Sequence, residues 1–429
     1  MYDLTILGCG WAGFNAALRA KQSGLKVCLI EKALIGGTCL NLGCIPTKTL
    51  IQAAKIYTLA RKSEAFGIEI RNPKINFQKL QQRKEKVIQG LSSGMQFMLK
   101  NIDFLNKEAR ILSSNELSTG QETIKTKFIL IATGSKPIEL AGFKFDGKKI
   151  LSSNDILTLK EIPASLLVIG GGVIGCEFAS LFSSLGTQVT IAEKMPQLLP
   201  GEDAEVATKI GTLFKKRGIR VNINTDAHSL NLGDYSLILV CVGRVPSTEN
   251  LGLEKAGIKL DKGRIVVDEY LKTNIGNIYA AGDCTGKTML AHFAAYQGSV
   301  AAWNIAHPEK PKKADNVNIP NCIFTDPEIS SVGLNEETAL AGGLDIKINK
   351  FDFLGLGMAR IAEETEGFLK IISEKSTDKI LGASIIGARA TELIAILTLA
   401  VSSQLKVSQL KDTVFAHPTF SESIGEALK

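Results

Sequence analysis

Short apolar runs separated by glycine-rich turns open the chain. Residues Tyr2 to Leu7 are mostly apolar without a strict alternation, which is typical of a strand buried on both faces. A helical stretch then continues to Ser23, and a second apolar run, Lys26 to Ile30, ends at Glu31. The pattern predicts a strand, a helix and a second strand at the start of the chain.

The same unit recurs 162 residues later, where Leu166 to Ile169 and Val189 to Ala192 are the two apolar runs. In both copies, glycines in G-x-G-x-x-G spacing follow the first strand, and an acidic residue follows the second. These glycines allow a tight turn and the approach of a pyrophosphate to a helix N-terminus, while the carboxylate accepts hydrogen bonds from a ribose. The chain therefore predicts two dinucleotide-binding domains and two dinucleotides. The corresponding positions are Gly8 and Gly170, Gly10 and Gly172, Gly13 and Gly175, Gly24 and Gly186, and Glu31 and Glu193.

The remaining pattern predicts further helices and strands. From about Ala314 onward it changes to strands of antiparallel type with helices between them. We expect helices at Thr49–Arg61, Phe77–Lys100 and Ala390–Ser402, and strands at Phe128–Ile131, Leu237–Val242, Ile278–Ala281, Cys322–Thr325, Lys347–Phe351, Gly367–Ile372 and Ile380–Ile386.

Composition excludes several classes of protein. A chain of 429 residues that is 45% hydrophobic can form two to four domains with ample cores. Its formal charge of +7 is spread without a dense basic block, so we expect no nucleic acid partner. The apolar run Leu393 to Val401 is too short to cross a bilayer, so we expect no membrane span. Because Met1 leads directly into a strand, we expect a cytoplasmic protein.

The segment Gly36 to Lys48 places two cysteines, Cys39 and Cys44, directly after the first nucleotide-binding unit. On a regular helix, five positions turn a side chain about 140° away from its partner. The two sulfurs could therefore bond only if the backbone were locally distorted, and Gly43 and Pro46 can supply the distortion. Zinc ligation is disfavoured because no second cysteine pair accompanies the four histidines. Two unrelated core thiols stay possible, and a redox pair is the interpretation that we favour.

The string Gly-Gly-Thr-Cys-Leu-Asn-Leu-Gly-Cys-Ile-Pro-Thr-Lys, from Gly36 to Lys48, resembles the redox-active segment of the pyridine nucleotide–disulfide oxidoreductases. Within that family its wording is most similar to the dihydrolipoamide dehydrogenases. The resemblance implies an α/β fold with two Rossmann-like FAD/NAD(P)-binding domains and a C-terminal α+β dimerisation domain. It also implies that Cys39 meets the substrate, that Cys44 faces the flavin, and that Lys48 lies near the flavin ring.

The resemblance assigns FAD to the first nucleotide unit and NAD to the second, and it implies no metal. Glu193 would repel a 2′-phosphate, which favours NAD over NADP. Between Thr225 and Tyr235 the chain is shorter than the family pattern, which has a β-meander there. The implied FAD-binding residues are Gly8, Gly10, Gly13, Glu31, Lys32, Gly37, Thr38, Lys48, Ala109, Thr133, Gly134, Ser135, Asp283, Leu290, Ala291 and His292. The implied NAD-binding residues are Gly170, Gly172, Val173, Ile174, Gly175, Glu177, Glu193 and Gly243.

Thiol chemistry needs a base, because the thiolate is the nucleophile. The string Ala416-His417-Pro418-Thr419-Phe420-Ser421-Glu422 supplies a candidate, although a histidine beside a proline is more often part of a turn. The string resembles the family's catalytic motif, in which His417 would deprotonate a dithiol and Glu422 would orient the imidazole. Phe415 stands where the family often has a second histidine. By the same resemblance Glu177 would approach Lys48 and the nicotinamide, with an exposed helical glutamate as the alternative.

Because this histidine acts on the disulfide of the other subunit in the family, the resemblance implies a homodimer. We expect oxidation of dihydrolipoamide with NAD⁺, with lipoylated acyltransferase or carrier domains of 2-oxoacid dehydrogenase complexes as partners. The alternatives are glutathione reductase, mercuric reductase and a flavoprotein that serves mainly as a complex subunit or binding protein. Glu193 argues against the first, and the absence of any cysteine after Cys322 argues against the second. The expected segments are 1–142 (FAD domain, first part), 143–263 (NAD domain), 264–313 (return to the FAD or central domain) and 314–429 (interface domain).

Overall fold

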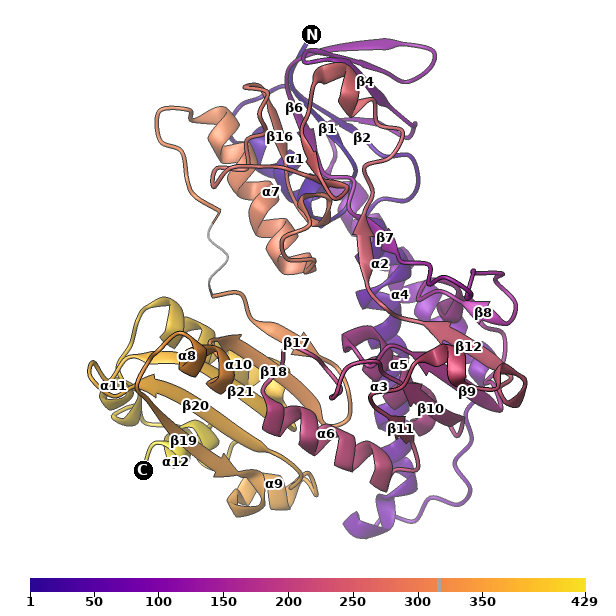
Figure 1. The fold of residues 1–429 in the computed structure, drawn as a ribbon, viewed down its shortest axis with the longest axis vertical. Coiled ribbons are helices and arrows are strands. Elements are labelled where there is room, and N and C mark those ends of the chain that lie inside the picture. The colour runs from indigo at the N-terminus through magenta and orange to yellow at the C-terminus, as the bar shows by residue number, and fades with distance from the viewer. Residues whose placement is uncertain (315–317) are drawn as a thin grey trace. The chain divides into compact units, whose positions relative to one another are not determined.

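The computed structural model describes residues 1–314 and 318–429, so three residues of the expected interface segment lie outside the described part. The chain divides into two compact units (Figure 1). Helices α3 (Cys44–Arg61) and α4 (Phe77–Met98) each have residues in both units. The first unit contains Met1–Thr49, Gln81–Ile138 and Gly243–Asn316, and the second contains Leu50–Leu80, Glu139–Val242 and Val317–Lys429.

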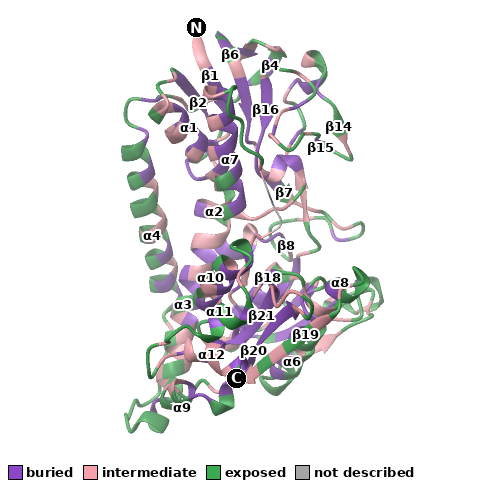
Figure 2. Ribbon diagram, turned by 90° about the vertical axis from the view of Figure 1, so that its left-hand side faces the viewer, coloured by how far each residue is buried: buried purple, intermediate pink, exposed green. Residues whose placement is uncertain are grey.

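The first unit is built on a seven-stranded sheet with the order β3-β2-β1-β6-β5-β4, in which β16 also pairs with β6. Strands β1, β2, β3, β6 and β16 are parallel, and helices α1 and α7 pack together and cover one face. The central strands are buried, as Figure 2 shows for β1, β6 and β16. The bounds are β1 Tyr2–Leu7, α1 Trp11–Gln22, β2 Val27–Ile30, α2 Gly37–Leu42, β3 Asp103–Leu105, β6 Thr123–Ile131, β16 Ile278–Ala280 and α7 Ala291–Ala306.

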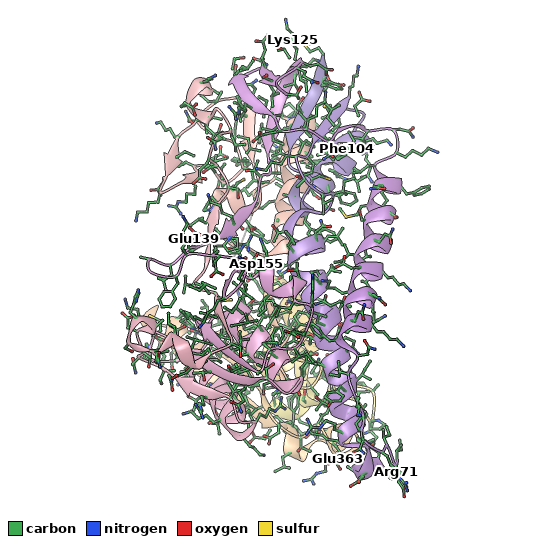
Figure 3. The ribbon with its side chains drawn as sticks, turned by 90° about the vertical axis from the view of Figure 1, so that its right-hand side faces the viewer. Arg71, Phe104, Lys125, Glu139, Asp155 and Glu363 are labelled. Atoms are coloured by element: carbon green, nitrogen blue, oxygen red, sulfur yellow. The ribbon has the colours of Figure 1, made fainter. Side chains whose placement is uncertain are left out.

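An antiparallel extension and two short ribbons complete this unit. Strand β5 pairs with β6 so that Glu116 lies opposite Lys125, and their side chains form an ion pair at 3.6 Å. Lys125 is labelled in Figure 3. Strands β7 and β13 pair in antiparallel fashion and bring residues far apart in the sequence side by side. The bounds are β4 Arg110–Ser113, β5 Glu116–Ser118, β7 Ser135–Pro137, β13 Arg244–Pro246, β14 Leu260–Asp261 and β15 Arg264–Ile265.

The second unit contains a five-stranded parallel sheet with the order β11-β10-β9-β12-β8. Helix α6 begins where the Asp203 side chain accepts hydrogen bonds from the Glu205 and Val206 amides, which caps the helix. Helix α5 instead begins at Gly172, without a side-chain cap. The bounds are β8 Ile150–Leu151, β9 Ser165–Ile169, α5 Val173–Ser184, β10 Gln188–Ala192, α6 Ala204–Lys216, β11 Arg220–Asn222 and β12 Leu237–Val240.

The same unit contains a five-stranded antiparallel sheet with the order β17-β18-β21-β20-β19. Strands β20 and β21 are almost wholly buried, whereas the edge strand β19 is largely exposed (Figure 2). Helix α10 packs on β18 and β21. The bounds are β17 Asn321–Ile323, β18 Glu328–Gly333, α8 Glu336–Ala341, β19 Ile346–Asp352, α9 Gly357–Ile361, β20 Phe368–Glu374, β21 Ile380–Gly387, α10 Ala390–Ser402, α11 Val407–Lys411 and α12 Glu422–Ala427.

Most predicted elements are present, and some bounds differ. The helix expected at Thr49–Arg61 begins earlier, at Cys44, because Pro46 lies in its first turn, where a missing N–H breaks no hydrogen bond. The strand expected at Leu237–Val242 ends at Val240, ahead of a turn in which Gly243 has φ of +120°. The shortened segment Thr225–Tyr235 contains two single 3₁₀ turns.

The predicted α/β class is confirmed, because each unit contains parallel strands connected through helices, and the second unit also contains an antiparallel sheet with helices. Among the described residues, no helix is long and apolar enough to span a membrane.

Candidate active site

The two candidate redox cysteines lie on either side of a break between two helices. Helix α2 ends at Leu42, Gly43 takes φ of −145° and ψ of −113°, and α3 starts at Cys44. A Cβ atom on Gly43 would lie 3.0 Å from the Thr38 carbonyl oxygen and 3.3 Å from the Cys39 Cα, so a side chain there would crowd the first cysteine. The backbone distortion that the spacing required is therefore present, and Gly43 is the residue that permits it.

The Cys39 and Cys44 side chains are thiols. Hydrogen bonding to Cys44 and burial raise the pKa of Cys39, while the charge of the Lys48 ammonium lowers it. A hydrogen bond that raises the pKa of Cys39 stabilises the form in which Cys39 keeps its proton.

The first glycine fingerprint forms a cradle with space on one side. Gly8 has φ of +101°, and a Cβ atom there would lie 2.3 Å from the Ala132 carbonyl oxygen. A Cβ atom on Gly13 would lie 1.8 Å from the Gly8 carbonyl oxygen. By contrast, no atom lies within 4 Å of a Cβ placed on Gly10, where α1 begins without a side-chain cap. Uncapped amides beside open space are what a pyrophosphate needs.

The second fingerprint repeats this cradle. Gly170 has φ of +102°, and its Cβ would lie 2.5 Å from the Cys241 carbonyl oxygen. A Cβ on Gly175 would lie 1.9 Å from the Gly170 carbonyl oxygen, and the space around Gly172 is open. Val173 and Ile174 follow as the first residues of α5. Both cradles thus fit a dinucleotide.

The two acidic residues at the strand ends make the same hydrogen bonds in the two copies. The Glu31 carboxylate accepts from the Cys9 amide at 2.7 Å and from the Ala33 amide at 2.8 Å. The Glu193 carboxylate accepts from the corresponding amides, at 2.5 and 2.7 Å. Because these bonds fix each carboxylate beside its glycine turn, each acid lies where a ribose would be bound. The amides that bond Glu193 belong to Gly171 and Met195.

A hydrogen-bonded chain links three polar residues of the first unit. Ser135 donates from its hydroxyl to the Asp283 carboxylate at 2.6 Å, and Arg244 donates to the Ser135 hydroxyl at 2.8 Å and carbonyl at 2.7 Å. Burial lowers the pKa of Arg244, and the charge of Asp283 opposes that change. Nearby, the Thr133 hydroxyl donates to the Ser247 carbonyl at 2.7 Å. The strand pairing of β7 with β13 therefore fixes Asp283, one of the residues that the resemblance assigns to FAD binding.

Arg244 was not among the predicted site residues, although its neighbour Gly243 was expected to bind NAD. Gly243 lies in the first unit, where its carbonyl accepts a hydrogen bond from the Ile138 amide at 3.1 Å. A single basic residue after a glycine gives no local sign of a buried partner 109 residues away. Only the pairing of the two ribbon strands shows the contact.

The remaining candidate residues of the first unit surround these elements. Gly37 and Thr38 open α2, Lys32 follows β2, Ala109 is buried beside the sheet, and Leu290, Ala291 and His292 lie at the start of α7.

In the second unit, Glu177 on α5 is buried rather than exposed, and its carboxylate accepts a hydrogen bond from the Phe324 amide at 2.9 Å.

His417 and Glu422 form the expected pair at the start of α12. The imidazole Nδ1 lies 2.8 Å from a Glu422 carboxylate oxygen, and the other oxygen accepts from the Thr419 amide at 2.8 Å. The Thr419 amide and His417 lower the pKa of Glu422, so the carboxylate is ionised at neutral pH. The His417 side chain is 79% exposed, whereas Glu422 is 20% exposed. The acid thus orients an imidazole whose other nitrogen faces outward.

Among the described residues, no group of three or more His, Cys, Asp or Glu side chains could hold a metal ion. The chemistry that the arrangement offers comes from a thiol pair, a histidine held by an acid, and two nucleotide cradles.

Comparison with known proteins agrees with this arrangement. Residues 2–298 match the pyridine nucleotide-disulphide oxidoreductase family, and residues 319–428 match its dimerisation domain. A dihydrolipoyl dehydrogenase from Bacillus subtilis is 38% identical over 460 residues, covering 99% of this chain and 97% of the relative. One from Chlamydia trachomatis is 39% identical over 448 residues, covering 99% of this chain and 96% of the relative.

Two solved structures are similar over the full length. LpdA from Mycobacterium tuberculosis superimposes with a TM-score of 0.92 at 29% identity, covering 100% of this chain and 99% of the other. The HOCl-induced flavoprotein disulfide reductase RclA from Escherichia coli superimposes with a TM-score of 0.89 at 31% identity, with the same coverage. The predicted family is confirmed: the chain belongs to the pyridine nucleotide-disulphide oxidoreductases.

Proposed function

We propose that this protein is a dihydrolipoyl dehydrogenase, which oxidises dihydrolipoamide to lipoamide with NAD⁺ through a reversible Cys39–Cys44 disulfide. The observation that carries this proposal is the pair of thiols on either side of a helix break, directly after a dinucleotide cradle. The full-length identity to dihydrolipoyl dehydrogenases supports the choice of dithiol substrate. The protein is an FAD-dependent and NAD-linked oxidoreductase.

The open cradles at Gly10 and Gly172 fit the two cofactors. When bound, FAD would supply a two-electron acceptor for the thiol pair, and NAD⁺ would be the final electron acceptor. The first cradle, with Glu31 and the fixed carboxylate of Asp283, would hold FAD. The second cradle, with Glu193, would hold NAD, and Glu177 would lie at its helix.

Each reacting side chain has a distinct task in this proposal. His417 takes a proton from the substrate dithiol, and Glu422 keeps the imidazole oriented and stabilises the imidazolium. The substrate thiolate attacks Cys39, and Cys44 leaves as the thiolate that faces the flavin. The Lys48 ammonium, whose charge already acts on Cys39, favours thiolate at the pair.

The dimerisation domain of the family supports a homodimer. The outward-facing His417 of one copy would serve the disulfide of the other. We propose lipoylated domains of 2-oxoacid dehydrogenase complexes as partners and the cytoplasm as location, because lipoyl arms must return to the disulfide form beside an NAD pool. We also propose the division into 1–142 and 264–313 for FAD, 143–263 for NAD and 314–429 for the interface.

The test is NADH formation by purified, FAD-loaded protein with dihydrolipoamide, run in parallel with NADP⁺. Rapid turnover with NAD⁺ and slow turnover with NADP⁺ are expected. Bound FAD without turnover on dihydrolipoamide would contradict the proposal, and NADH-dependent reduction of other disulfides would then identify the substrate class.

Replacing Glu193 by serine is expected to raise the KM for NAD⁺ about tenfold, the cost of a lost charge-assisted hydrogen bond, and to leave kcat nearly unchanged. The carboxylate also repels a 2′-phosphate, so the preference for NAD⁺ over NADP⁺, measured as the ratio of their kcat/KM values, should fall in the variant. Initial rates with both nucleotides measure this, with Lys194→Ala as the control at the adjacent position. If the KM for NAD⁺ is unchanged in Glu193→Ser, Glu193 does not contribute to nucleotide binding.

A further inference from the structure

Trp11 is the first residue of helix α1, directly after Gly10 of the first cradle. The two fingerprints correspond at a fixed offset of 162 residues, and the position that corresponds to Trp11 in the second copy is Val173, the first residue of α5. Both helices begin at a glycine without a side-chain cap. The geometry of the cradle therefore does not require a tryptophan at this position, and the presence of an indole needs a separate explanation.

The indole nitrogen of Trp11 is buried, and within the described residues it has no hydrogen-bond acceptor of acceptable geometry. Buried indole N–H groups normally have a partner, so a donor without one requires an explanation. The ring is also fixed in direction, because it packs edge-on against Phe14 with 6.5 Å between ring centroids and an 86° angle between planes. In the part of the chain that the structure describes, the indole N–H is thus held in place without an oxygen or nitrogen that accepts its hydrogen.

The segment that carries the redox cysteines packs directly on this position. The Gly36 amide donates to the Cys9 carbonyl at 2.8 Å, and a Cβ atom on Gly37 would lie 2.9 Å from the Gly10 Cα. The hydrogen bond with Cys44 and burial raise the pKa of Cys39, and the indole N–H of Trp11 acts on the same sulfur and lowers it. A thiol sulfur is a weak acceptor, whereas a thiolate is a strong one. A Cys39 thiolate would therefore be an acceptor for the indole N–H, which has none among the described residues.

We propose that Trp11 donates a hydrogen bond from its indole N–H to the Cys39 sulfur whenever that sulfur carries negative charge. The proposal rests on the proposed function, in which Cys39 exchanges with a dithiol. Trp11 would then be a functional residue of the disulfide centre that contacts a reacting atom.

The exchange contains one step in which this contact acts. First, a substrate thiolate bonds to Cys39, the Cys39–Cys44 bond breaks, and its electron pair leaves with Cys44. Second, the other substrate sulfur, once deprotonated, attacks the substrate sulfur that is bonded to Cys39. That bond breaks and its electron pair leaves with Cys39, so the substrate loses two electrons and two protons and the protein pair gains two electrons. Because a better-stabilised thiolate leaves faster, the indole N–H accelerates this second step.

The test replaces Trp11 by phenylalanine, which keeps an aromatic ring and removes the donor. In the reduced holoenzyme, the rate at which iodoacetamide alkylates Cys39 is measured against pH by mass spectrometry of the Cys39 peptide. We expect Trp11→Phe to shift this profile toward higher pH and to slow alkylation at neutral pH by about three- to tenfold. The matched control is Trp303→Phe, because Trp303 contacts His307, Arg19 and Lys312 and lies outside the disulfide segment. An unshifted profile in Trp11→Phe overturns the proposal.

A second measurement does not depend on the folding of Trp11→Phe. The chain has two tryptophans, so Trp303→Phe leaves Trp11 as the single indole fluorophore. Its emission should change with pH at the same midpoint as Cys39 alkylation, and this change should vanish when Cys39→Ser is added. If the tryptophan emission does not change when Cys39 ionises, the proposal is wrong. Neither measurement uses dihydrolipoamide or NAD⁺, so failure of the proposed function would be seen separately, in the turnover assay.

Discussion

Replacing Cys44 by serine is expected to abolish NADH formation from dihydrolipoamide, with a loss of at least about 10⁴-fold, as for removal of an essential nucleophile. A serine hydroxyl cannot form the disulfide that accepts the substrate electrons, so no exchange can be completed. The fold should tolerate the change, because Cys44 is the first residue of α3, where serine is well accepted. Initial rates at saturating NAD⁺ measure the loss.

The matched control is Cys322→Ser. The Cys322 thiol donates to the Thr391 carbonyl at 3.8 Å, a contact that a hydroxyl can replace, and the residue lies in the second unit on β17. The rate of NADH formation by Cys322→Ser should stay near that of the unaltered protein. Titration of thiols in the unfolded chain should also show two more reactive thiols after reduction in the control, and no such increase in Cys44→Ser. Residual rapid turnover in Cys44→Ser would exclude the disulfide mechanism.

The spacing of glycines and acids that recurs after 162 residues was the strongest structural signal in the sequence. This spacing is set by geometry within a single strand-helix-strand unit. The turn at Gly8 and Gly170, the close approach at Gly13 and Gly175, and the carboxylate bonds of the strand-end acids all recur in the structure. Each of these features depends on residues within one strand-helix-strand unit, or on the backbone of the neighbouring strand. Such features leave a fixed spacing of residue types along the chain, and this spacing can be recognised in the amino-acid sequence alone.

Contacts between distant segments left no comparable signal. Arg244 bonds Ser135 because β13 pairs with β7, and the start of α2 is held against the first glycine turn by the hydrogen bond from the Gly36 amide to the Cys9 carbonyl. The sequence separation of each pair is set by the connection between elements, which obeys no short-range rule. Similarly, the burial of Glu177 depends on the Phe324 amide, which lies 147 residues away.

Replacing His417 by glutamine is expected to lower kcat for dihydrolipoamide oxidation by about 10²- to 10⁴-fold, the usual contribution of a general base. Glutamine can still bond Glu422, so the turn before α12 should keep its shape. NADH-dependent reduction of a one-electron dye, which needs no deprotonation of a dithiol, should continue at nearly the unaltered rate. Steady-state rates of the two reactions with the same preparation measure the difference.

Glu422 provides the companion variant and a pH signature for this base. The Thr419 amide and His417 lower the pKa of the Glu422 carboxyl, so the carboxylate is charged at every pH above its ordinary titration range. Glu422→Gln therefore removes the same negative charge throughout the range from about pH 5 to pH 8, and its rate should stay below that of the unaltered protein across that range. Below that range the carboxylate of the unaltered protein gains a proton, the charge is lost in both proteins, and the two rates should converge. A deficit that instead grows toward low pH would mean that Glu422 acts through something other than its charge on His417. Equal loss of dithiol oxidation and dye reduction in His417→Gln would assign the histidine to folding or assembly and not to proton transfer.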